Sequence, residues 1–315
     1  MSGTILDVPG IRVGHQSLGS SGVTAIVSDA PGGMVGAVDV RGGGPGTRET
    51  DLLAPHNTVE RVHAVILSGG SAFGLAAADG AMRELESRGR GFAVFGEGNP
   101  GPRVPIVPAA VIFDLILGDP IRPSADDGAR AVAAAFDAPD SSSGSIGAGC
   151  GATAGVLRGG FGQASSLVDE YVVAAAVVAN PMGNVIDEAT GEFFAAGDHG
   201  VVDKQAFRAL ERPMPKLNTT IGVIATNAPV PVAQLQRLAM TGHDGLARAV
   251  RPAHSPLDGD TLFAVSTAEE TQVQDSMLLG RLCEAAAQCV EEAIVDAVKS
   301  AQVGYNVKTW QEIAQ

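Results

Sequence analysis

Six short apolar segments constrain the fold of this chain more than any other feature of its sequence. They are rich in Val, Ile, Leu and Ala, and they lie at residues 24–27, 36–40, 63–68, 172–180, 221–227 and 261–266. Each is much shorter than the roughly 20 residues of a membrane-spanning helix, and this composition predicts buried β-strands. Strands that are apolar on both faces must be covered on both faces, so we expect sheets layered against helices.

Helical periodicity separates several of these segments. Apolar residues recur at helical spacing within residues 72–86, 125–136, 232–240 and 277–298. Ser124 precedes the second of these helices and is a suitable N-cap, because its hydroxyl can satisfy a free backbone N–H of the first turn. With 315 residues, the chain is long enough to bury a full core.

The charge and cysteine content exclude several functional classes. The formal net charge of −14 opposes the basic patch that nucleic-acid phosphates require, so we expect no nucleic-acid partner. The three cysteines are too few for a disulfide framework, and the first residues lack the basic and apolar regions of a signal peptide. We therefore expect a cytoplasmic protein without a membrane partner. Its histidines and cysteines show no metal-ligand spacing, so we expect neither a metal nor a cofactor.

A polar segment runs directly into a core strand at Asn218-Thr219. Residues 192–218 carry charges of both signs and two prolines, which predicts an exposed, partly extended connection. Asn and Thr are common at the ends of strands, and this junction can be read in that way. The alternative is self-cleavage, in which the Thr219 hydroxyl attacks the preceding carbonyl and water opens the resulting ester. The product is an N-terminal threonine whose amine, with an ordinary pKa of roughly 7.7–8, serves as a general base.

Several motifs in the same order resemble the DmpA/NylC family of N-terminal nucleophile hydrolases, peptidase family S58. They are AVDVRGGGPGTRETD at 37–51, LSGGSAFG at 67–74, VPIVP at 104–108, GAGCGATAG at 147–155, LNTTI at 217–221, HDGLAR at 243–248 and RPAHSPLDGDT at 251–261. The resemblance implies an α+β fold of the αββα sandwich type, with two stacked sheets flanked by helices. It also implies one domain over residues 1–315, cleaved between Asn218 and Thr219 into an α-chain, 1–218, and a β-chain, 219–315.

The resemblance assigns roles to four residues. Thr219 matches the nucleophile, Asp258 and Asp260 match the pair that orients it, and Asn180 matches the side-chain amide of the oxyanion hole. Two carboxylates at i and i+2 of an extended segment point to the same face, and their repulsion raises at least one pKa. Without the resemblance, Asp258 and Asp260 also fit a surface Asp-Gly-Asp turn, and Asn180 fits a turn with Pro181.

Two positions depart from the family pattern. Phe113 stands where other members carry a Tyr beside the oxyanion site, and Val156 stands where they carry a Lys. Arg158 lies two residues further on, and we expect it to supply charge support but no base, because an arginine stays protonated.

Three other residues could be considered for catalysis, but we expect a different role for each of them. The turn at residues 69–74 has the spacing G-x-S-x-x-G rather than that of a nucleophile elbow, so we expect Ser71 to pack or to line the site. We expect His243 and His254 to be structural.

The main hypothesis is an autoprocessing hydrolase of linear amides, namely 6-aminohexanoate oligomers or small peptides, acting through an acyl-enzyme. Alternatives within the family are an aminopeptidase, a β-peptidyl aminopeptidase or a D-amino-acid amidase or esterase. Residues 107–110 lack the carboxylate that aminopeptidase members use to meet the substrate amine. Alternatives outside it are an ornithine-acetyltransferase-type acyltransferase and a non-catalytic protein of the same fold. The resemblance also implies a homo-oligomer of αβ units, a tetramer.

Overall fold

The predicted apolar segments all form strands in the computed structural model, which describes residues 3–211 and 218–315. One six-stranded sheet has the order β12-β13-β14-β15-β3-β5. Its strands are β12 (Gly160–Val168), β13 (Tyr171–Ala179), β14 (Ile221–Thr226), β15 (Thr261–Ser266), β3 (Met34–Val40) and β5 (Arg61–Val62). The sheet is antiparallel except that β14 and β15 run parallel, with Ile221 paired to Thr261.

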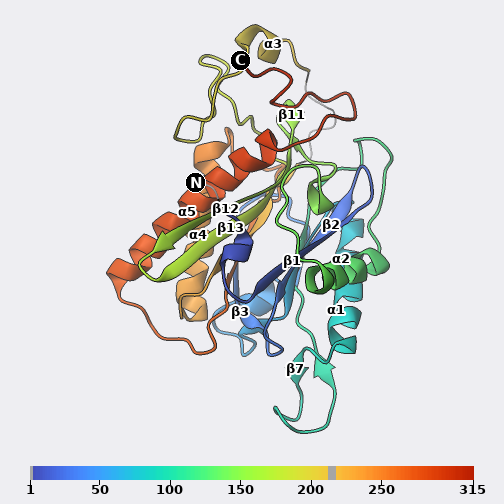
Figure 1. Cartoon of the computed structure of the whole chain (residues 1–315), viewed down its shortest axis with the longest axis vertical. Helices are drawn as coiled ribbons and strands as arrows, with labels where there is room; N and C mark the ends of the chain where they lie inside the picture. Colours follow the sequence, from blue (N-terminus) through green and yellow to red (C-terminus); the bar gives the residue numbers. More distant parts are fainter. Residues whose placement is uncertain (1–2, 212–217) are drawn as a thin grey trace.

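A second, five-stranded sheet lies face to face with the first. Its order is β1-β2-β6-β9-β4, with β1 (Ile11–Ser17), β2 (Gly22–Ser28), β6 (Ala64–Ser68), β9 (Ala109–Val111) and β4 (Thr47–Arg48). Two short ribbons complete the strands: β10 (Thr153–Ala154) with β11 (Leu157–Arg158), and β7 (Phe92–Ala93) with β8 (Arg103–Val104). The β7–β8 hairpin projects from one end of the molecule (Figure 1) and exposes 62% of Phe92.

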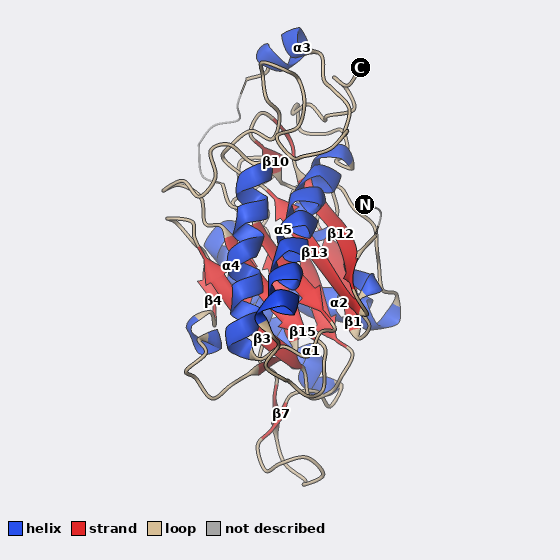
Figure 2. Ribbon diagram, turned by 90° about the vertical axis from the view of Figure 1, so that its left-hand side faces the viewer, coloured by secondary structure: helices blue, strands red, loops and turns tan. Residues whose placement is uncertain are grey.

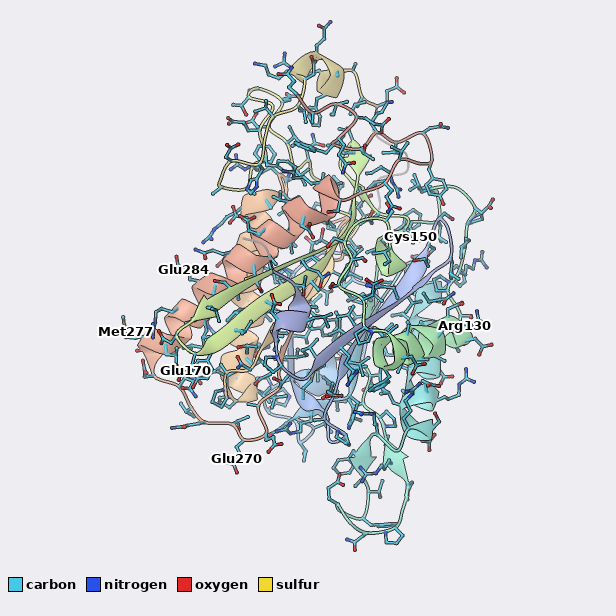
Figure 3. All side chains as sticks on the ribbon, viewed as in Figure 1. Arg130, Cys150, Glu170, Glu270, Met277 and Glu284 are labelled. Atoms are coloured by element: carbon cyan, nitrogen blue, oxygen red, sulfur yellow. The ribbon has the colours of Figure 1, made fainter. Side chains whose placement is uncertain are left out.

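Helices cover the outer face of each sheet. α4 (Val232–Ala249) and α5 (Ser276–Lys299) pack on the six-stranded sheet, and Figure 2 shows both helices lying across its strands. α1 (Ala77–Ser87) and α2 (Ala125–Asp137) pack on the five-stranded sheet. Arg130 of α2 and Glu284 of α5 mark the outer surfaces of the two helical layers in Figure 3. This is the expected αββα sandwich.

Two helix boundaries differ from those predicted. The first predicted helix begins as a 3-10 turn at Ser71–Ala76 before α1, and α4 continues to Ala249 rather than ending at residue 240. Ser124 is the N-cap of α2 as predicted, and its backbone N–H donates to the Asp127 carboxylate at 2.8 Å.

Alternating side chains of the central strands fill different apolar layers. Along β14, Val223 packs between the two sheets, whereas Ile224 packs under the helices α4 and α5. Phe161 and Phe263 are fully buried in the layer between the sheets. A strand in this position needs apolar residues on both faces, which explains why the six segments show no polar alternation.

The connection at residues 192–218 is less exposed than predicted. Phe193, Val202 and Phe207 are buried in the same apolar layer as α4 and α5, and α3 (Lys204–Arg208) forms within the segment. The prediction overweighted the charged residues, because the apolar side chains between them cover the end of the helical layer. Residues 212–217, which include both prolines, lie outside the described residues.

The longest of the described helices, α5, has 24 residues and carries charged side chains. In the described ranges, none is both long and apolar enough to cross a membrane.

Candidate active site

The four residues of the expected site meet at one end of the six-stranded sheet. Asn180 directly follows β13, Thr219 lies two residues before β14, and Asp258 and Asp260 lie just before β15. Since β13 runs antiparallel to β14 and β14 runs parallel to β15, the end of the first strand and the starts of the other two share one edge. Asn218 continues this pairing through a parallel bridge to Asp258. The topology therefore brings together residues that are up to 80 positions apart.

Thr219 is buried and is held by two hydrogen bonds, one from its backbone N–H and one from its hydroxyl. Thr219 is only 5% exposed, and its backbone N–H donates to the Asn180 carbonyl at 2.8 Å. The Thr219 hydroxyl donates to the carbonyl oxygen of Asn218 at 2.5 Å. The hydroxyl oxygen thus lies against the carbonyl group that it must attack if the chain cleaves itself.

Glycines allow the neighbouring loops to approach this threonine closely. A Cβ atom on Gly259 would lie 2.9 Å from the Thr219 hydroxyl and 2.7 Å from the Gly44 carbonyl oxygen. A Cβ atom on Gly42 would lie 2.2 Å from the Asp260 nitrogen. The Gly-rich block after β3 is therefore packed backbone to backbone against the Asp-Gly-Asp segment, and the Gly44 N–H donates to the Asp258 carbonyl at 2.8 Å.

Asp260 accepts three N–H groups from two directions. The Thr220 N–H donates to Oδ1 at 2.8 Å, while the His254 backbone and ring Nδ1 donate to Oδ2 at 3.2 and 2.8 Å. The His254 ring lies edge-on to the His243 ring, with 4.9 Å between centroids. Burial, followed by the neighbouring His254, lowers the pKa of His243 to about 4, so His243 is neutral at neutral pH.

Asp258 is fixed by a different set of donors. Its carboxylate accepts from the Met182 N–H at 3.0 Å and from the Ser255 hydroxyl and N–H at 2.5 and 3.1 Å. Burial raises the pKa of Asp258, and the nearby charge of Asp260 raises it further. The expected upward shift of one carboxylate pKa is confirmed, with burial as the larger cause. Within the described residues, neither carboxylate hydrogen-bonds to the Thr219 hydroxyl.

The Asn180 side chain links two loops beside the threonine. Its Oδ1 accepts from the Thr153 N–H at 2.8 Å, and its Nδ2 donates to the Phe113 carbonyl at 3.2 Å. Asn180 is fully buried, and one hydrogen of its amide nitrogen is used by Phe113. The same nitrogen carries a second hydrogen, and the role of Asn180 in an oxyanion hole stays a prediction.

Arg158 and Val156 face other parts of the molecule. The Arg158 guanidinium is buried, donates to the Ser145 hydroxyl and the Cys150 carbonyl, and lies 5.4 Å from the Tyr305 ring centre. Burial lowers the pKa of Arg158. Val156 packs against the helix-side apolar layer. Among the contacts of the described residues, the Arg158 side chain makes none with Thr219, so its charge support stays a prediction.

A pocket of about 240 Å³ opens beside Thr219. Its apolar lining includes Val111, Ile112, Phe113, Pro256 and Leu257. The polar side chains on its wall belong to Ser71, Asn218 and Thr219, and the residues described around it include no charged side chain. The described parts of the chain also contain no group of three or more His, Cys, Asp or Glu residues that could hold a metal ion.

The sequence reading missed several supporting residues. It expected a structural role for His254 but not the hydrogen bond between this ring and Asp260. It did not find Thr153 or Ser255, which bind the side chains of Asn180 and Asp258. The position of Ser255 three residues before Asp258 was a local signal, because a Ser followed at this spacing by an acidic residue is the pattern of a capping box, in which the later side chain binds the Ser backbone N–H.

The sequence matches one family model and several named proteins. The model of peptidase family S58 matches residues 3–309. The chain is 45% identical to an uncharacterized aminopeptidase of Mycobacterium leprae, over 98% of this chain and 93% of the relative. It is 33% identical to a 6-aminohexanoate-oligomer endohydrolase of a Kocuria species, over 84% of this chain and 74% of the relative.

Solved structures share the fold. The L-aminopeptidase D-Ala-esterase/amidase of Ochrobactrum anthropi, described as a variant of the Ntn hydrolase fold, matches with a TM-score of 0.76 and 23% identity, over 95% of this chain and 86% of that one. A β-aminopeptidase of a Burkholderia species matches with a TM-score of 0.73 and 23% identity, over the same shares. At this identity the structural likeness supports the αββα fold alone, and the family rests on the sequence match. The chain therefore belongs to peptidase family S58 and is a hydrolase of C–N amide bonds.

Proposed function

We propose that this amide hydrolase is made by self-cleavage and uses Thr219 as its N-terminal nucleophile. The observation that carries the proposal is the contact between the Thr219 hydroxyl and the Asn218 carbonyl at 2.5 Å, where Thr219 is buried and Asn218 is half-buried. In the first step, Oγ1 attacks the Asn218 carbonyl carbon. The C–N bond breaks, the hydroxyl proton passes to the Thr219 nitrogen, and an ester remains. Water then hydrolyses the ester, which leaves a carboxylate on Asn218 and a free amine on Thr219.

The same groups support the later turnover of substrate. The Asn180 carbonyl already accepts the Thr219 N–H, so it holds the new amine next to Oγ1. The amine takes the hydroxyl proton when Oγ1 attacks a substrate carbonyl, and returns it to the leaving amine. Asp260 fixes the Thr220 N–H and Asp258 fixes the 180–183 loop, so both carboxylates orient the head group through the backbone.

The lining of the pocket favours substrates that carry no charge on the acyl side of the cleaved amide bond. An α-ammonium group placed in it would lose its hydration without a carboxylate partner among the described lining residues, which is costly. Internal amide bonds of linear oligomers, such as those of 6-aminohexanoate, carry no charge near the cleaved bond. We therefore favour internal cleavage of linear amides over removal of a free N-terminal residue, the activity in the names of the mycobacterial relatives.

The nucleophile is tested with two isosteric substitutions at adjacent threonines. Thr219→Val removes the proposed nucleophile, and we expect an intact 315-residue chain whose amide hydrolysis falls at least about 10³-fold. Thr220→Val is the control, because the Thr220 hydroxyl is buried and makes no hydrogen bond with the described residues. This control should be cleaved into two chains and should hydrolyse amides at the wild-type rate. Hydrolysis at the wild-type rate by Thr219→Val would contradict the proposal.

The substrate class is tested with matched amides that differ only in the free amine. The panel contains the linear 6-aminohexanoate trimer, its N-acetyl form, alanine p-nitroanilide and N-acetylalanine p-nitroanilide. We expect the acetylated member of each pair to be cleaved at least as fast as the free one. A preference of more than about tenfold for the free amines would instead establish an aminopeptidase. Transfer of the acyl group to an added amine, with little hydrolysis, would identify an acyltransferase.

The homo-oligomer of αβ units and the single domain across both chains belong to the same proposal. The mass of the native particle by light scattering tests the first. Co-elution of the two chains tests the second.

A further inference from the structure

A strained turn forms one wall of the Thr219 pocket. Ser71 has a φ of 54°, and the preceding Gly70 has a φ of 79°, so two consecutive residues lie in the left-handed region. Glycine adopts this region without steric cost, whereas a serine there has unfavourable contacts of its Cβ atom. Non-glycine residues held in this way are enriched at active sites and ligand-binding sites.

The surrounding structure holds the turn in place through three hydrogen bonds. The Gly69 N–H donates to the Gly22 carbonyl at 2.9 Å, and the Gly70 N–H donates to the Asp114 carboxylate at 2.7 Å. The Ser71 N–H donates to the Ile112 carbonyl at 2.9 Å. Each residue of the turn is therefore anchored to a different neighbour, which is the condition under which backbone strain persists.

Hydrogen bonds through the backbone place this turn close to the nucleophile. Ser71 is tied to Ile112, and the adjacent Phe113 carbonyl accepts from the Asn180 side-chain amide at 3.2 Å. The Asn180 carbonyl in turn accepts from the Thr219 N–H at 2.8 Å. Ser71 and Asn180 thus flank the same segment, and Ser71 and Thr219 line the same pocket.

Three polar side chains lie on the described wall of that pocket, and that of Ser71 has no partner and no other assigned role. Thr219 carries the proposed nucleophile, and the Asn218 amide donates to the Pro181 carbonyl at 3.0 Å. The Ser71 hydroxyl makes no hydrogen bond with any described residue, and Ser71 is partly exposed. A hydroxyl fixed on a rigid turn and free of partners is ready to bind a group that enters the pocket.

We propose that Ser71 is a catalytic residue whose hydroxyl donates a hydrogen bond to the carbonyl oxygen of the cleaved amide, together with the Asn180 amide. This assignment rests on Thr219 being the nucleophile. When Oγ1 of Thr219 attacks the carbonyl carbon, the π electrons of the carbonyl move to its oxygen, and Ser71 stabilises the negative charge that forms there. The charge returns to the carbonyl as the C–N bond breaks and the leaving nitrogen takes the proton held by the Thr219 amine.

Two substitutions separate the hydroxyl from the strained backbone. Ser71→Ala removes the hydroxyl and keeps a Cβ atom in the left-handed region. Ser71→Gly removes the hydroxyl and also relieves the strain, so its melting temperature should rise above that of the wild type. Asn306→Gly is the control for strain relief alone, because Asn306 has a φ of 57° and lies exposed, outside the pocket lining.

The measurement is kcat and KM of the cleaved enzyme on the member of the amide panel that the wild type cleaves fastest. We expect kcat to fall about 10²-fold in both Ser71 variants, as for other single oxyanion donors, with KM changed less than about threefold. Asn306→Gly should keep the wild-type kcat. The proposal is overturned if both Ser71 variants stay within threefold of the wild-type kcat. It is also overturned if Ser71→Gly is fully active and only Ser71→Ala is slow, because backbone shape would then be responsible.

The same experiment separates the two proposals. If the wild type neither splits nor hydrolyses any amide of the panel, the proposed function fails and the role of Ser71 fails with it. If the wild type does both, and Thr219→Val does neither, active Ser71 variants contradict the role of Ser71 alone.

Discussion

Gly259→Ala is expected to slow the enzyme by moving its nucleophile. The added Cβ atom would lie 2.9 Å from the Thr219 hydroxyl, whereas ordinary contacts of this kind begin at 3.4 Å. The new atom would also lie 2.7 Å from the Gly44 carbonyl oxygen and 2.9 Å from the Pro45 Cα atom, so backbone atoms of the Gly-rich block restrict how residue 259 can adjust. The hydroxyl must therefore shift by about 0.5 Å. Since a misplacement of about 1 Å costs about 10²-fold in rate, we expect a loss of about tenfold.

The assay compares Gly259→Ala with Gly280→Ala. A Cβ atom on Gly280 would have no atom within 4 Å, and this position lies on α5, where alanine is favoured. We expect Gly259→Ala to accumulate uncut precursor, to lose amide hydrolysis about tenfold and to lose about 1–3 kcal/mol of unfolding free energy. Gly280→Ala should match the wild type in cleavage and turnover. Wild-type cleavage and turnover in Gly259→Ala would refute the packing argument.

Three further predictions concern groups around and behind the site. His254→Asn keeps a donor to Asp260 and suits the φ of 53° at this position, so it should retain most activity, whereas His254→Ala should lose about tenfold in kcat. Burial raises the pKa of Asp114 to about 6 from 3.8, so the folded state binds more protons than the unfolded state between these values. The contribution of Asp114 to stability should therefore fall by up to about 2–3 kcal/mol as pH rises from 4 to 7, measured as the change with pH in the difference between the urea unfolding free energies of the wild type and Asp114→Asn. Phe161→Ala should cost about 3–5 kcal/mol in the same urea assay, because the ring is fully buried between the sheets, while Phe92→Ala on the exposed hairpin should change stability by less than about 0.5 kcal/mol.

The central strands could be predicted from the sequence because they are apolar on both faces. β14 and β15 are fully buried along their lengths, so no polar residue interrupts the pattern. β1 and β12 were missed for the opposite reason. β12 carries two glycines and three polar residues in GFGQASSLV, a composition that favours a loop. Gly162 is required there because a Cβ atom would lie 2.1 Å from the Ala293 carbonyl of α5.

The candidate site was predictable only where a motif identified it. Asn180, Thr219, Asp258 and Asp260 were assigned by resemblance, and the structure shows that strand pairing brings them to one edge. Their hydrogen-bond partners depend on the register of distant segments. The hydrogen bond from the Met182 N–H to the Asp258 carboxylate is one example, because it joins residues 76 positions apart. Such contacts follow from the packed fold and not from local sequence.

The intact mass of the purified protein tests the central claim most directly. We expect two chains, with residues 1–218 and 219–315, in equal amounts, and a threonine as the first residue of the smaller chain. Thr219→Val should give a single chain under the same conditions. A wild-type protein that hydrolyses amides as one intact chain would contradict activation by cleavage before Thr219, as would a break at any other peptide bond.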